Sequence, residues 1–295
     1  MCEPTDSPKM ISLQRPIAPD LPHLLADATS HRFVSPHCDD TTLSCGGTMA
    51  RVAQAGLRAE VAVIFGSEPD PTMPLSPLAE HLHACWGLTS GQVVASRRAE
   101  EVVAATLLGS TVDFLPFPDA IYRESHYTSD TALFSEPMID EEDLPDRLAE
   151  ALGVNDPAKS VTQIYCPLAI GGHVDHRHAF SAGVRLSRAG WAVYFYEDLP
   201  YALRPSATEA RVSAIKATGL DLQPMVTIDV ASTWKLKVLA IMAYGSQLPT
   251  LFGSLVGQVD PRARIDAVLH AHALRVGNGV LGERYWRLAD GVTPG

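Results

Sequence analysis

Residues 31–40 have the sequence HRFVSPHCDD, in which an apolar strand pattern runs directly into a loop of ionisable side chains. Residues 162–176 (TQIYCPLAIGGHVDH) repeat this arrangement more than a hundred positions later. In open α/β sheets, ligands bind at the carboxyl ends of the strands. We therefore expect the two loops to meet at one edge of a sheet and to form a single hydrolytic metal site.

Strand patterns recur along the chain and alternate with helical patterns, which predicts an α/β fold with a mostly parallel sheet and helices on both faces. The predicted strands are 31–35, 61–65, 112–115, 162–167, 193–196 and 225–228. Two helix starts carry cap signals, one at residues 206–209 with a stop at Gly219, the other at Asp260-Pro261 with a stop at Gly277. The length of 295 residues and the hydrophobic content of 46% fit one domain over 1–295.

The charge balance excludes several classes of partner. The formal net charge is −11 and no Lys/Arg cluster is present, which argues against nucleic acid and anionic membranes and favours a small molecule. Five cysteines without a Cys-x-x-Cys pair are typical of a reducing compartment. Residues 1–30, taken as an N-terminal extension, lack a signal-peptide pattern, so we expect a cytoplasmic protein.

Two stretches, 67–95 and 122–146, fit the alternation poorly. Long connections in a compact domain are often functional, and the aromatic residues here are as typical of sugar-facing loops as of anchors that pack a loop down. Both stretches are therefore either lids over a site or packed surface.

His37 and Asp40 are three residues apart at the point where a strand turns into a helix, so both side chains can face one side. With His176 they offer two imidazoles and one carboxylate. Three protein ligands leave a position open for water and substrate, as in catalytic zinc sites, whereas structural zinc takes four protein ligands. We expect Zn²⁺ at this site.

Hydrolysis of an amide also needs a general base. Asp39 is the candidate, because the side chains of neighbouring residues diverge and Asp39 can face the water while Asp40 faces the metal. His173 can polarise the amide oxygen and protonate the leaving amine, and Asp175 can orient that imidazole. Each residue taken singly also has a structural explanation, such as helix capping by the two aspartates, but two ionisable clusters at two strand ends are hard to explain as caps.

These motifs resemble the LmbE/PIG-L family of zinc de-N-acetylases, which hydrolyse the N-acetyl group of N-acetylglucosamine conjugates on a Rossmann-like sheet. The resemblance covers about 31–287 and rests on Pro-His-x-Asp-Asp at 36–40 and His-x-Asp-His at 173–176. Weaker matches support it in order and spacing: Gly46-Gly47, Arg97-x-x-Glu100, Leu108-Gly109, Phe117-Pro118-Asp119, Lys237 and Ser246-Gln247.

The resemblance implies zinc ligands at His37, Asp40 and His176 and a general base at Asp39. It also implies that His173 stabilises the oxyanion and acts as an acid. Arg97 and Asp119 match positions near the sugar in the family, although an Arg-x-x-Glu pair can simply brace a helix start.

The chain departs from the family pattern at a few positions. Cys38 replaces a common proline and Thr41 a frequent glutamate, neither of which removes a ligand or the base. Gly171 stands where some members have a tyrosine that assists the oxyanion, so Tyr122 or Tyr127 from the long loop is expected to help instead. In addition, Tyr244 lies where the family often has histidine.

Two other functions remain open. A 2-His-1-carboxylate iron oxygenase can use His37, Asp39 and His176, but such enzymes generally have jelly-roll folds. A sugar- or nucleotide-binding module without chemistry is the other, although no P-loop or Gly-x-Gly-x-x-Gly is present. The sequence favours a zinc-dependent de-N-acetylase acting on an N-acetylated amino-sugar conjugate in a biosynthetic pathway, with an aglycone that the sequence does not identify.

Overall fold

The computed structural model describes residues 23–123, 126–135, 141–153, 157–256 and 260–289. The fold is built on one seven-stranded sheet of order β3-β2-β1-β4-β5-β7-β6. All six predicted strands are present, and a seventh, β7, was not predicted. The strands are β1 (Ser30–Ser35), β2 (Arg58–Val63), β3 (Thr111–Phe114), β4 (Thr162–Pro167), β5 (Ala192–Tyr196), β6 (Leu222–Asp229) and β7 (Gly282–Leu288).

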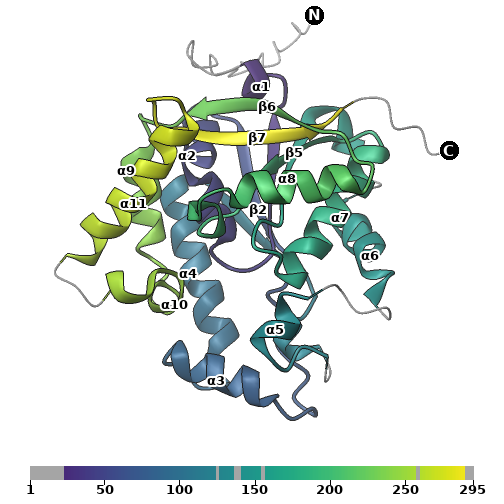
Figure 1. The fold of residues 1–295 in the computed structure, drawn as a ribbon, viewed down its shortest axis with the longest axis vertical. Helices are drawn as coiled ribbons and strands as arrows, with labels where there is room; N and C mark the ends of the chain where they lie inside the picture. The colour runs from purple at the N-terminus through teal and green to yellow at the C-terminus, as the bar shows by residue number, and fades with distance from the viewer. Residues whose placement is uncertain (1–22, 124–125, 136–140, 154–156, 257–259, 290–295) are drawn as a thin grey trace, which may run out of the picture.

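Helices cover both faces of the sheet, as expected. Helices α2 (Asp40–Gln54), α4 (Val93–Leu108) and α9 (Trp234–Ile241) pack together on one face, and α6 (Leu144–Ala151) and α7 (Val174–Arg188) pack on the other (Figure 1). The remaining helices are α1 (His23–Ala26), α3 (Pro77–Cys85), α5 (Asp130–Leu133), α8 (Ala207–Ala217), α10 (Leu248–Phe252) and α11 (Pro261–Val276), with short 3₁₀ turns η1 (Ala120–Tyr122), η3 (Pro157–Val161), η4 (Tyr201–Leu203) and η5 (Gly253–Leu255).

The strand order brings the two predicted loops together. β1 pairs in parallel with β2 on one side and with β4 on the other, so the chain changes direction along the sheet between β1 and β4. Loops on the two sides of such a switch point leave a crevice between them at the carboxyl edge. The residues after β1 and the residues after β4 therefore lie side by side at that edge.

Strand β7 lies between β5 and β6 and runs antiparallel to both, whereas β5 pairs in parallel with β4 on its other side. Its sequence, GERYWRL, is rich in charge, yet Glu283 is only 5% exposed. The Glu283 carboxylate accepts hydrogen bonds from the backbone amides of Gly47 and Thr48 in α2 and from Lys237 Nζ at 2.7 Å. A buried charge is tolerable when it is paired and hydrogen-bonded in this way, and these distant partners are the reason why the apolar pattern of the sequence missed the strand.

The predicted helix starts are both present, but only one has its predicted cap. The Asp260 carboxylate accepts from the Ala263 amide, whereas Ser206 has a φ of 60° and makes no side-chain cap hydrogen bond. The two stretches expected to be long connections contain short helices, α3 in 67–95 and α5 in 122–146. Residues 1–22 of the predicted N-terminal extension lie outside the described residues. Among the described helices, none has the length and apolar character needed to cross a membrane.

Candidate active site

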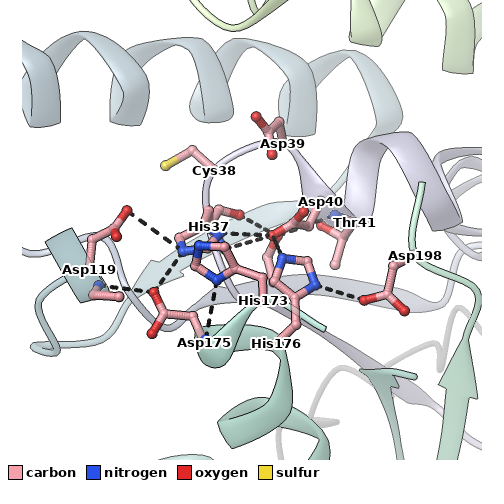
Figure 2. A network of polar contacts seen from close by, with 12 residues as sticks. His37, Cys38, Asp39, Asp40, Thr41, Asp119, His173, Asp175, His176 and Asp198 are labelled. Carbon is pink, nitrogen blue, oxygen red and sulfur yellow. Dashed lines mark hydrogen bonds and ion pairs between the residues drawn. The ribbon is translucent and has the colours of Figure 1, made fainter. Parts of the chain in front are cut away.

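The loop after β1 and the start of α7 place three ligand atoms around one point. Asp40 opens α2, and its Oδ2 lies 3.5 Å from His37 Nδ1 and 3.3 Å from His176 Nε2. The same carboxylate oxygen accepts a hydrogen bond of 2.8 Å from the His37 backbone amide, which fixes the loop. Figure 2 shows His37, Asp40 and His176 pointing toward one another. Their ligand atoms all lie within 4.8 Å of one another, so the three residues can hold a metal ion.

Each of the two imidazoles has its other ring nitrogen bound to a buried carboxylate. His37 Nε2 lies 2.8 Å from Asp175 Oδ2, and His176 Nδ1 lies 2.7 Å from Asp198 Oδ1. Histidines that bind metals usually donate their far N–H to a carboxylate, which sets the tautomer and the orientation of the ring. This arrangement turns His37 Nδ1 and His176 Nε2 toward Asp40. The donor set of two nitrogens and one oxygen therefore fits a catalytic zinc ion.

The charges at this point favour a cation. Burial lowers the pKa of His176, but Asp40 and Asp198 outweigh it and raise the pKa to about 10. Burial alone would raise the pKa of Asp40, yet His176 and His37 hold it far below its usual range. His37 behaves likewise: burial opposes its charge, whereas Asp119 and Asp175 raise its pKa well above the usual value.

The described residues contain two groups that could hold a metal ion, His37-Asp40-His176 and His37-His173-Asp175, and Asp39 belongs to neither. Its side chain points away from Asp40 and the three imidazoles in Figure 2, so the predicted divergence of the neighbouring side chains is present. Burial first, and then the charge of Asp40, raise the pKa of Asp39 well above its usual range. The backbone φ of Asp39 is 109°, a value that is uncommon for residues other than glycine.

His173 lies beside the ligands, with its ring centroid 5.0 Å from that of His37 and 5.7 Å from that of His176. Its partner differs from the one expected. The Asp175 carboxylate binds His37, Arg123 and the Ala120 amide, and it is the backbone amide of Asp175 that donates to His173 Nδ1 at 3.2 Å. Because Nδ1 accepts this bond, the proton of the neutral ring is on Nε2. Burial first, and then His37, lower the pKa of His173 to about 3.

Arg97 and Asp119 border the same loop. Arg97 Nη2 donates to the Cys38 carbonyl at 3.3 Å, and Arg97 Nη1 lies 3.8 Å from Asp119 Oδ2. That carboxylate oxygen is also 3.6 Å from His37 Nε2. Glu100, in contrast, turns toward Ser246 and binds its amide and hydroxyl, so the Arg-x-x-Glu residues do not pair with each other.

The tyrosine that lies beside Gly171 is Tyr201, not Tyr122 or Tyr127 as expected. The hydroxyl of Tyr122 is bound to His83, and the hydroxyl of Tyr127 is bound to Glu141. The ring of Tyr201 lies over Gly171, where an added Cβ would come within 2.4 Å of it. Tyr201 also makes an edge contact with the His176 ring, at 5.8 Å between centroids. Its hydroxyl makes no hydrogen bond to the described part of the chain, so it is free to bind a ligand.

Sequence reasoning missed several residues around the site. Asp198 follows the buried strand β5, so the rule that identified the other two loops also applies to it. Arg123 bridges Asp175 and Glu141, with 2.6 Å contacts to each carboxylate. Phe134 packs edge-on against His173 at 5.4 Å. Residues of the 122–146 stretch thus reach the site, although no sequence pattern indicated which ones.

A protein-family model described as "PIG-L: GlcNAc-PI de-N-acetylase" matches residues 32–187, which is more than half of the chain. The chain belongs to this family. The match extends from β1 to the end of α7 and so includes both loops of the site.

Individual PIG-L relatives are deacetylases. The chain is 34% identical over 191 residues to a 2'-N-acetylparomamine deacetylase of Niallia circulans, covering 59% of this chain and 68% of the relative. It is 31% identical over 219 residues to a protein of the same name from Streptomyces fradiae, covering 73% and 72%. A solved structure, the zinc-inhibited form of teicoplanin deacetylase, matches with a TM-score of 0.70 and 25% identity, covering 89% of this chain and 99% of that one. This PIG-L protein is therefore an enzyme, a hydrolase of N-acetyl amides.

Proposed function

We propose that the protein is a zinc-dependent de-N-acetylase that removes the acetyl group from a 2-acetamido sugar in a specialised-metabolite precursor. The single observation that carries the proposal is the convergence of His37 Nδ1, Asp40 Oδ2 and His176 Nε2, with both imidazoles held from behind by carboxylates. The first substrate class to test is an N-acetylated aminoglycoside precursor such as 2'-N-acetylparomamine, because that is the substrate in the names of the two relatives.

Zinc would be held by His37, Asp40 and His176, and when bound it supplies Lewis acidity that lowers the pKa of water and polarises a carbonyl oxygen. Asp39 takes the proton of the attacking water. Its buried position and raised pKa suit a general base, because a carboxylate with a raised pKa takes a proton from water more readily than an exposed one.

His173 donates a hydrogen bond from Nε2 to the developing oxyanion. Since its Nδ1 accepts the Asp175 amide, the ring has no second proton to give while that bond stands. We therefore assign the return of the proton to the leaving amine to Asp39 rather than to His173, which differs from the expectation from the sequence. In this proposal Arg97 and Asp119 contact sugar hydroxyls from the neighbouring loop.

Acetate release tests the proposal. Zinc-loaded protein is incubated with 2'-N-acetylparomamine, an N-acetylglucosaminyl glycopeptide and an N-acetylglucosaminyl inositol, with Asp39→Asn alongside. We expect release by the parent and a loss of about 10²–10⁴-fold in the variant, which is the usual contribution of a general base, with zinc content unchanged. If the parent binds zinc and releases no acetate from any of the three, the proposal is wrong. Turnover of any of these substrates that requires oxygen and ferrous iron would instead favour the iron oxygenase.

A further inference from the structure

The backbone of Asp39 adopts a conformation that needs support. Its φ of 109° lies in the region that residues with a side chain avoid, and such outliers persist only where the surroundings hold them. The carbonyl of Asp39 accepts the Leu43 amide at 2.9 Å in the first turn of α2. The amide of Asp39 turns the other way and donates to Glu101 Oε2, also at 2.9 Å.

Glu101 is a completely buried carboxylate on α4, with an exposed fraction of 0%. The hydroxyl of Tyr244 donates to the same Oε2 at 2.8 Å and lies 2.9 Å from Thr42 Oγ1. Since a hydroxyl has one proton, Tyr244 donates to Glu101 and accepts from Thr42. The other oxygen, Oε1, has no hydrogen-bond partner among the described residues. Through Glu101, the Asp39 amide before α2 is connected to α4 and to Tyr244 in the segment after α9.

The Asp39 amide connects this hydrogen-bond network to the proposed general base, because the amide and the carboxylate belong to the same residue. Glu101 belongs to neither metal-capable group of the described residues, and its contacts are to the Asp39 backbone, not to a ligand side chain. The φ of Asp39 determines where its carboxylate lies relative to Asp40, and the two point in different directions in Figure 2. Fixing the amide therefore fixes the separation between the proposed base and the proposed ligand.

We propose that Glu101 is a positioning residue of the de-N-acetylase: its carboxylate holds the Asp39 amide, and Tyr244, which is itself bound to Thr42, holds the carboxylate. This inference rests on the proposed function in so far as Asp39 is the base. It also gives a role to Tyr244, which stands where the family often has histidine. A phenol at this position donates to the carboxylate without adding a positive charge beside it.

The kinetic test combines Glu101→Gln and Tyr244→Phe with the matched control Glu100→Gln. Glutamine keeps the shape of Glu101 and can present its oxygen to both donors, but it lacks the negative charge that strengthens both bonds, and it places a buried N–H at the position of Oε1, which has no partner among the described residues. Because misplacement of a reacting group by about 1 Å can cost about 10²-fold, we expect kcat to fall 10- to 100-fold with KM within about threefold and zinc content unchanged. Glu100 binds only Ser246 among the described residues, so its variant should stay within about threefold of the parent.

A double variant separates positioning from a general structural role. In the Asp39→Asn background, Glu101→Gln should cause little further loss, because the group that it positions is gone. Losses that multiply would contradict the proposal. A crystal structure of Glu101→Ala provides a readout independent of activity: φ at Asp39 should leave the region near 109°. If it stays there, Glu101 does not hold the peptide; if it moves while the parent releases no acetate, the positioning is real and the proposed function is wrong.

Discussion

Replacing Asp198 with asparagine should weaken zinc binding by about 10- to 100-fold. Asp198 Oδ1 lies 2.7 Å from His176 Nδ1, its side chain is 1% exposed, and its Oδ2 accepts the Ile170 amide at 3.0 Å. Asparagine keeps the shape but loses the charge, so a charge-assisted hydrogen bond becomes a neutral one or is lost. Such bonds to charged groups contribute about 1.5–3 kcal/mol, and substitution of the partners of metal-bound histidines typically costs 10- to 100-fold in affinity.

The assay is a competition titration of the metal-free protein against a chromophoric zinc chelator at several pH values. Glu197→Gln is the matched control, because the neighbouring carboxylate binds Arg284 and Trp286 instead of an imidazole. Burial lowers the pKa of His176, but Asp40 and Asp198 raise it to about 10, so the imidazole is protonated without metal. Zinc must therefore displace that proton at any pH below this value. Affinity should therefore rise with pH, by about tenfold per pH unit for each displaced proton, and less steeply in Asp198→Asn. A zinc affinity for Asp198→Asn within twofold of the parent at every pH would refute the reasoning.

Further predictions concern a ligand, a tyrosine and a buried ion pair. His176→Ala should lose both zinc and activity because one of three protein ligands is gone, and a full zinc complement measured by atomic absorption would exclude His176 as a ligand. Tyr201→Phe should keep zinc and fold but lose about 10²-fold in kcat if the free hydroxyl helps the oxyanion, and unchanged turnover would assign the ring to packing alone. Lys237→Met should lower the free energy of unfolding by about 3–5 kcal/mol in urea titrations, because Glu283 would keep a buried charge without its 2.7 Å partner; a loss under 1 kcal/mol would contradict this.

The sequence predicted the sheet and the convergence of the three proposed ligands because both follow local rules. The six predicted strands are short apolar runs, and the proposed ligands come from short motifs directly after two of them. Strand β7 is not an apolar run, because its buried Glu283 is stabilised by partners from α2 and α9 that lie far away in the sequence. No pattern within seven residues can contain that information.

The support around the site was harder to predict, for the same reason. Glu101 is 62 positions from the peptide that it binds, and it stands on α4 beside Glu100, Val102 and Val103 with nothing in its spacing to distinguish it. Asp198 was the exception, because it follows a buried strand and could have been found. The contact expected between the Asp175 carboxylate and His173 rested only on their closeness in the sequence. In the structure, that carboxylate binds His37 and Arg123 instead.

The position of β7 constrains the order in which the protein can assemble during synthesis. β6 is made some fifty residues earlier, yet among the described strands it pairs only with β7, which must enter between it and β5. Until residues 282–288 leave the ribosome, β6 has no strand to join, β5 presents an open edge, and Lys237 lacks its counter-ion. Unpaired edges of this kind favour association with other chains. A chain stalled before β7 would carry both loops of the candidate active site and still be a candidate for chaperone binding.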